Sequence, residues 1–168
     1  MKAKGFAALI ALVAVERVIE LVVSKRNLQW SKAHGGKEFG AGHYPVMVAL
    51  HSGLLLGAVL EARRRPRPVL SRAMVAVVIA AQALRWWCIT TLGKQWNTRV
   101  VVVPGAPRVV DGPYRVLPHP NYVAVVTEGA ALPLAGGAWI TAAVFTIANA
   151  ALLRSRIRVE NEALQGLT

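Results

Sequence analysis

The stretch GPYRVLPHPNYVAVVTEGAALPL, residues 112–134, joins a polar, proline-rich segment to a long apolar run. Proline restricts its own backbone and that of the preceding residue, so Pro118 and Pro120 are expected to hold His119 in a stiff, non-helical segment. Proline also suits the first position of a helix, which predicts a helix that begins at Pro120. The free N–H groups at that helix start favour an anionic group beside His119. The alternative is a structural role, in which His119 caps or packs at the end of an interfacial loop.

Five apolar runs of membrane length, or nearly so, occur at residues 6–23, 44–60, 73–92, 122–135 and 138–153. A full span needs about 20 apolar residues, so the first three runs suffice or nearly do, whereas the last two are short. Only Gly136 and Gly137 separate the last two runs, which predicts a tight helical hairpin. With 168 residues, of which 55% are hydrophobic, the chain is predicted to be an all-α integral membrane protein. We expect about five transmembrane helices in one domain, residues 1–168.

The segment before the hairpin, residues 93–121, is predicted to lie at the membrane interface. β-Branched residues flank a Pro-Gly turn at residues 104–105, a pattern that favours a short β-hairpin or an extended loop over a helix. Residues 1–92 would then supply the first three spans, and residues 93–168 the loop, the hairpin and a tail helix. The candidate anchors at the level of the headgroups are Trp86, Trp87 and Trp96.

The net charge of +12 comes from basic residues that are concentrated in loops. The arginine-rich loop at residues 61–72 joins two apolar runs, so its expected partner is the anionic surface of membrane lipids rather than nucleic acid. Because spans alternate sides, residues 24–43, residues 93–121 and the C-terminal tail share one face, with eleven Lys and Arg residues against seven on the other. This excess favours the cytoplasmic side of the cell membrane for the first face, although the arginine-rich loop on the other face opposes it.

Ionisable residues within the apolar runs must pair with one another or face a polar cavity, because isolated charge is expensive in a membrane. Arg85 and Glu128 are predicted to form such a pair. His43 and His51 stand eight residues apart, which is poor spacing for metal ligands, so no metal site is predicted. The single cysteine excludes a disulfide within the chain. The polar and charged residues concerned are Glu16, Arg17, Glu20, His51, Gln82, Arg85 and Glu128.

The tail LRSRIRVENEAL, residues 153–164, is predicted to continue the last run into water as a helix. A proline-bracketed histidine followed by an Arg/Glu helix resembles the C-terminal half of the isoprenylcysteine carboxyl methyltransferase family of integral membrane methyltransferases. The residues that match the family motifs are Gly112, Pro113, Tyr114, His119, Pro120, Tyr122, Arg156, Glu160 and Leu164.

The N-terminal half is similar to the bacterial branch of that family. The similar stretches are ERVIELVVSKRN, residues 16–27, and GAGHYPVMVALH, residues 40–51. Members of this branch are associated with type III polyketide synthases and O-methylate long-chain alkylpyrones or alkylresorcinols. The resemblance therefore implies a lipophilic acceptor from the bilayer, which carries either such a hydroxyl group or a prenylcysteine-type carboxylate.

The resemblance further implies S-adenosylmethionine as methyl donor, held between the proline-rich loop and the tail helix on the cytoplasmic face. Catalytic roles are implied for His119, Arg156 and Glu160, with Arg156 orienting the acceptor and His119 as an alternative base. The implied cofactor-binding residues are Tyr114, His119, Pro120, Asn121, Tyr122 and Glu160.

The chain departs from the family pattern at three positions. Pro118 stands where an Arg usually precedes the His, Ala124 where a Gly usually follows the Tyr, and Asn161 where a second Glu commonly follows the first. The first change removes a cation from the expected site. The last leaves open whether Glu160 or Glu162 fills the role of the family Glu.

Two other interpretations stay open on the sequence alone. Membrane sterol reductases carry a similar His-Pro-x-Tyr stretch, which suggests an NADPH-dependent reductase, although their motif is longer and lies in a larger protein. The other interpretation is a non-catalytic membrane module that binds lipid or a partner protein, for which neither cofactor would bind. The oligomeric state is not determined by these patterns.

Overall fold

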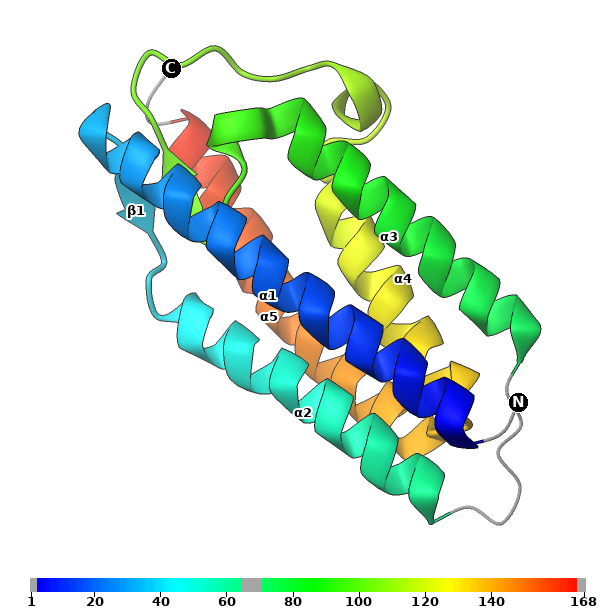
Figure 1. Ribbon diagram of the computed structural model, residues 1–168. Coiled ribbons are helices and arrows are strands. Elements are labelled where there is room, and N and C mark those ends of the chain that lie inside the picture. The colour runs from blue at the N-terminus through cyan, green and yellow to red at the C-terminus, as the bar shows by residue number, and fades with distance from the viewer. Residues whose placement is uncertain (1–2, 65–70, 166–168) are drawn as a thin grey trace.

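The computed structural model describes residues 3–64 and 71–165, in which five α-helices form an elongated bundle (Figure 1). Residues 65–70, part of the arginine-rich loop expected at residues 61–72, lie outside the described residues. The helices are α1 (Ala3–Ala33), α2 (His43–Arg63), α3 (Arg72–Leu92), α4 (Pro120–Ala135) and α5 (Trp139–Gln165). Two strands, β1 (Lys37–Phe39) and β2 (Val100–Val102), and two short 3-10 helices, η1 (Gly93–Gln95) and η2 (Gly112–Arg115), lie between them.

Three of these helical segments, within the described residues, are long and apolar enough to cross a membrane: His43–Arg63, Arg72–Gln95 and Trp139–Gln165. The remaining two are α1 and α4. Charged residues interrupt α1, which is 31 residues long, whereas α4 has only 16 residues and is short for a span of about 20. The prediction of an all-α membrane protein is confirmed, with α1 continuing about ten residues beyond its predicted apolar run.

Local sequence signals account for the helix boundaries. Ser71 caps α3 by accepting a hydrogen bond from the Met74 N–H at 3.3 Å. Pro120 occupies the first turn of α4, as predicted. Gly137, with φ of 73°, allows the tight turn between α4 and α5, so the predicted hairpin is present. The predicted tail helix is the C-terminal part of α5.

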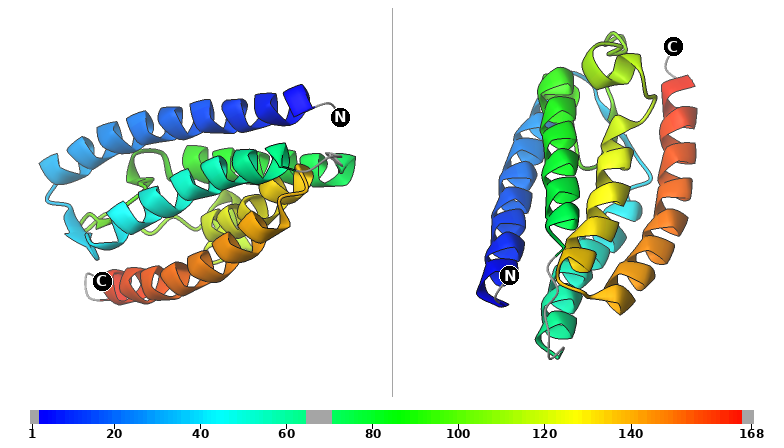
Figure 2. Two further views of the ribbon diagram at one scale, coloured as in Figure 1. Left: turned by 90° about the horizontal axis from the view of Figure 1, so that it is seen from below. Right: turned by 90° about the vertical axis from the view of Figure 1, so that its right-hand side faces the viewer.

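The helices pack around α4, which lies against both α3 and α5, while α5 also packs against α2 (Figure 2). An apolar core lies at the end of the bundle that contains the start of α1. Phe6 of α1 and Leu132 of α4 belong to this core, and Gly136 leaves room for the ring of Phe6. Both strands of the described residues lie toward the opposite end of the bundle (Figure 1).

A cluster of charged side chains crosses the middle of the bundle. Glu128 of α4, only 3% exposed, accepts hydrogen bonds from Arg17 of α1 and from Arg85 of α3, the latter at 2.7 Å. The predicted pair of Arg85 and Glu128 is thus confirmed. Arg17 also pairs with Glu20, and Glu16 accepts hydrogen bonds from Gln82 and Trp86. The charges that interrupt α1 are therefore satisfied by α3 and α4.

The ends of the helices opposite the apolar core meet at one face, together with both strands (Figure 1). β2 pairs antiparallel with β1, with Val100 opposite Phe39 and Val102 opposite Lys37. The prediction of a local hairpin around residues 104–105 is wrong, because the backbone of β2 pairs with the segment that joins α1 to α2. Residues 106–110 form an extended loop, which was the other predicted arrangement.

The three tryptophans do not all face the headgroups as predicted. Trp87 is 54% exposed, in agreement with an anchor, whereas Trp96 is only 2% exposed and Trp86 donates a hydrogen bond to Glu16 inside the bundle. The difference arises because Trp96 follows the turn at η1, which directs it inward beneath the loop rather than outward from α3.

Close packing of α4 on α5 gives a testable expectation. A Cβ added at Gly129 would overlap the ring of Phe145, which is buried. Gly129→Ala is therefore expected to lower the unfolding free energy by about 1–3 kcal/mol, as overpacking does in other cores. Gly53→Ala is the matched control, because no atom lies within 4 Å of its added Cβ. Thermal unfolding of both variants in detergent would check this, and equal melting temperatures would contradict it.

Candidate active site

His119 lies where the proline-rich segment meets α4. Its φ of −135° and ψ of 62° place it outside the helical region, as expected for the residue before a proline. The Nδ1 atom is 3.6 Å from Oε1 of Glu160, and the Nε2 atom is 3.2 Å from Oδ1 of Asn161. The ring also stacks on Tyr122, with 5.5 Å between ring centroids. Both ring nitrogens are thus engaged by the tail portion of α5.

Glu160 joins the loop and the tail helix. It accepts a hydrogen bond from the Tyr122 hydroxyl in addition to its ion pair with His119. Glu162, two residues further along α5, is exposed instead. Of the two candidate glutamates, Glu160 is therefore the one that faces the proline-rich loop.

Arg156 lies one turn before Glu160 on α5 and is only 5% exposed. Its guanidinium donates a hydrogen bond to the carbonyl of Thr98 at 2.9 Å and lies 3.5 Å from the sulfur of Met47. It also lies 6.0 Å from the centre of the Tyr122 ring. Arg156 thus ties α5 to the segment before β2 and to α2.

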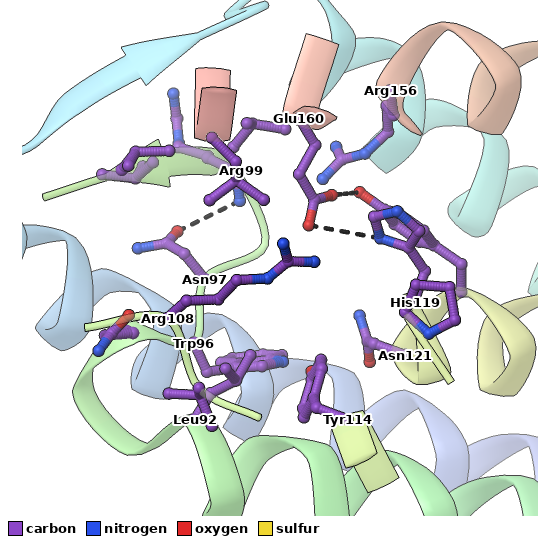
Figure 3. Close-up of a pocket in the computed structure, with 18 residues that line it drawn as sticks. Leu92, Trp96, Asn97, Arg99, Arg108, Tyr114, His119, Asn121, Arg156 and Glu160 are labelled. Atoms are coloured by element: carbon purple, nitrogen blue, oxygen red, sulfur yellow. Dashed lines mark hydrogen bonds and ion pairs between the residues drawn. The ribbon is translucent and has the colours of Figure 1, made fainter. Parts of the chain in front are cut away.

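A cavity of about 160 Å³ opens between these elements at the face where the helix ends meet (Figure 3). Pro120 is absent from its wall and instead begins α4 beneath it, so its expected contact with the cofactor is not direct. The other predicted site residues all line this first cavity: Tyr114, His119, Asn121, Tyr122, Arg156 and Glu160.

Four wall residues that the sequence did not single out as site residues come from the segment after α3. Arg99 is held by an ion pair with Glu38 at 2.7 Å, whereas Arg108 extends into the cavity and has no ion-pair partner among residues 3–64 and 71–165 (Figure 3). In the sequence, both arginines are recognisable only as basic residues of the predicted interfacial loop. They line the same cavity as the motif residues because that loop folds over the ends of the helices. The four residues are Trp96, Asn97, Arg99 and Arg108.

A second cavity of about 150 Å³ adjoins the first and extends between the helices. Met47, His51 and Leu55 of α2 line one side of it, which follows α2 away from the face of the first cavity. Arg17 and Arg85 contribute to its far wall. Five residues line both cavities and form their shared wall: Trp96, Asn97, Asn121, Tyr122 and Arg156.

Two groups of the loop have shifted pKa values. The adjacent carboxylate of Glu160 raises the pKa of His119 above its ordinary value of 6.5, which favours the imidazolium form. Burial raises the pKa of the Tyr114 phenol, so this side chain stays neutral. Tyr114 is therefore suited to donate a hydrogen bond into the first cavity, not to accept a proton.

The isoprenylcysteine carboxyl methyltransferase (ICMT) family matches residues 74–166, which is more than half of the chain. The chain belongs to this family. A protein of Bacillus subtilis (strain 168), named uncharacterized protein YpbQ, is 39% identical over 162 residues, which cover 95% of this chain and 96% of the relative. No solved structure gives a significant match. Membership of the ICMT family indicates a membrane methyltransferase.

The structure shows the surroundings of the three residues that differ from the expected ICMT pattern. Asn161, which stands in place of a second Glu, holds Nε2 of His119 through its side-chain oxygen. Pro118 lines the first cavity without a charge, but Arg108 brings a guanidinium to the same cavity from another segment. Ala124 is fully buried inside α4. The first cavity therefore contains a guanidinium that does not belong to the sequence motif.

The pair of His119 and Glu160 predicts a pH dependence. Because the folded pKa of His119 is raised, the stabilisation from this pair is complete below about pH 6.5, the unfolded value, and is lost as the pH rises through the folded pKa. Glu160→Gln should therefore lower the pKa of His119. NMR titration of the His119 ring in both proteins would measure this, and an unchanged or higher pKa in the variant would contradict the assignment.

Proposed function

We propose that this protein is an S-adenosylmethionine-dependent O-methyltransferase that acts on a lipophilic acceptor, either a hydroxyl of alkylpyrone or alkylresorcinol type or a prenylcysteine-type carboxylate. The observation that supports the proposal is the contact of Glu160 with both Tyr122 and His119. This contact closes a polar cavity at one end of a membrane bundle in a chain of the ICMT family. We place this end on the cytoplasmic side, where the donor is synthesised and where the excess of Lys and Arg is expected.

The first cavity has groups that suit S-adenosylmethionine, which carries a carboxylate, an ammonium group, a sulfonium and an adenine ring. Arg108 and the N-terminal end of α4 offer positive charge to the carboxylate, and Glu160 offers negative charge to the ammonium group or acceptors to the ribose. Trp96 Nε1 and Asn121 Oδ1 are buried on the cavity wall and have no hydrogen-bond partner in the part of the chain that the structure describes. A buried donor and acceptor of this kind fit the edge of an adenine ring.

S-adenosylmethionine, when bound, supplies an electrophilic methyl group for an in-line displacement. The contribution of the protein is then to align the reactants and exclude water. Arg156 and Tyr122 lie on the wall shared by the two cavities, where an acceptor from the bilayer would approach the donor. Thr98 and Met47 restrict the guanidinium of Arg156, so it is positioned before any ligand arrives.

A pair of variants on α5 tests the donor site. Glu160→Gln is expected to weaken binding of S-adenosylmethionine by about tenfold to a hundredfold, because a hydrogen bond to a charged group contributes about 1.5–3 kcal/mol. Glu162→Gln is the matched control and should bind like the wild type, because Glu162 is exposed away from the cavity. Equilibrium dialysis with labelled donor would measure both, and thermal unfolding would verify that both variants fold. Equal affinities in the two variants would contradict the assignment.

A second test separates the carboxylate from the rest of the donor. Arg108→Met is expected to weaken binding of S-adenosylmethionine by about tenfold, because a charge-assisted contact is removed. Binding of 5′-methylthioadenosine, which lacks the carboxylate, should be unchanged in the same variant. Arg108→Lys should restore part of the affinity. If both ligands lose affinity equally, Arg108 does not bind the carboxylate.

A further inference from the structure

The second cavity has a charge-neutral inner wall. Arg17, Glu20 and Arg85 contribute to that wall, and Glu128 lies behind it. The two arginines pair with the two glutamates, because Arg17 contacts both glutamates and Arg85 lies 2.7 Å from Glu128 and 3.5 Å from Glu20. These opposite charges therefore satisfy each other. Among the described residues of this inner wall, no cation is left without a carboxylate partner; Arg156, which has no ion-pair partner among the described residues, lies instead on the wall shared with the first cavity.

His51 presents a hydrogen-bond acceptor to the same cavity. Its Nδ1 atom lies 2.9 Å from the carbonyl oxygen of Met47. Because a carbonyl can only accept, Nδ1 carries a proton, and in the neutral ring the lone pair is therefore on Nε2. The edge of the ring meets Phe145 at a centroid distance of 5.3 Å and an interplanar angle of 86°, which holds the imidazole in place. In its neutral form, His51 is thus an oriented base at the side of the cavity.

Asn149 of α5 supplies a second acceptor. Its side chain is only 2% exposed and lines the second cavity, and its Oδ1 atom has no hydrogen-bond partner among residues 3–64 and 71–165. An unpaired polar atom is costly inside a membrane bundle, so this oxygen is an acceptor that a ligand hydroxyl can satisfy. Together, Asn149 and His51 favour a head group that carries hydroxyl protons over a carboxylate that can only accept.

His119 does not offer the same chemistry. Glu160 and Asn161 engage its two ring nitrogens, and the contact with Glu160 favours its protonated form. An imidazolium cannot accept a proton from an acceptor. His119, which the motif suggested as an alternative base, therefore holds the loop against the tail helix. His51, in contrast, has a lone pair on Nε2 when its neutral ring carries the proton on Nδ1.

We infer that the second cavity binds the hydroxylated head of the lipophilic acceptor and that Nε2 of His51 receives the proton of the hydroxyl that is methylated. This inference rests on the proposed function, which supplies a sulfonium methyl donor in the adjoining cavity. The acceptor oxygen forms a bond to the methyl carbon while the carbon–sulfur bond breaks, and that electron pair stays on sulfur as a neutral thioether. His51 becomes an imidazolium and returns the proton to water after the product leaves. Asn149 accepts a hydrogen bond from a second hydroxyl of the head.

The test uses two acceptors with the same long alkyl chain. One is a resorcinol, a weak acid that needs a base, and the other is a 4-hydroxy-2-pyrone, which is already ionised at neutral pH. His51→Gln should reduce kcat for the resorcinol by about 100-fold, as expected for loss of a general base, and change kcat for the pyrone much less. His43→Gln is the matched control, because His43 lies two turns away on α2 and outside the cavity wall. Binding of S-adenosylmethionine should be unchanged in both variants.

The outcomes separate this inference from the proposed function. Failure of the wild type to bind S-adenosylmethionine would overturn the proposed function itself. A wild type that binds the donor but leaves the resorcinol unmethylated overturns the inference alone, as does an equal loss of kcat for both acceptors in His51→Gln. If His51→Gln does not fold, Asn149→Leu provides the second measurement. It should raise KM for the resorcinol severalfold with unchanged donor affinity, and an unchanged KM would contradict the acceptor site.

Discussion

The buried contact of Glu128 with Arg17 and Arg85 is the interaction on which the arrangement of the bundle depends. Charged groups cannot remain isolated within a membrane, so the three helices that carry them must meet at one depth and with one rotation. This requirement joins α1, which is too polar to be held by apolar packing alone, to α3 and α4. A buried ion pair of this kind is better evidence for a defined geometry than for net stability. Here it sets the inner wall of the second cavity.

At the end of the bundle that carries the strands, the proline-rich loop and the tail helix are held together by other contacts. Prolines on both sides of His119 stiffen the loop, and Glu160 on the tail helix contacts the loop through His119 and Tyr122. Because Arg156 also ties the tail helix to the carbonyl of Thr98, three segments distant in sequence enclose one polar cavity. The site therefore needs no separate globular domain. The ends of membrane helices and one ordered loop supply all of its walls.

The two cavities differ in their position in the bundle and in their walls. The first lies at the face with the strands and has charged walls, whereas the second follows α2 inward between the helices. Their shared wall includes Tyr122 and Arg156, where the two reactants of the proposed methyl transfer would meet. Arg108 brings a guanidinium to the first cavity from a segment outside the sequence motif. A departure from a family pattern is thus interpretable only with the surroundings of the changed residue.

The sequence by itself determined the helical membrane class, the start of α4 at Pro120 and the hairpin at Gly136 and Gly137, because these depend on apolar length and on local backbone preference. It also predicted the pair of Arg85 and Glu128, since charge within an apolar run demands a partner. The tertiary structure alone decided that β2 pairs with β1, that Glu160 rather than Glu162 faces the loop, and that Arg108, His51 and Asn149 line cavities. These choices depend on contacts between residues far apart along the chain, which no local preference specifies.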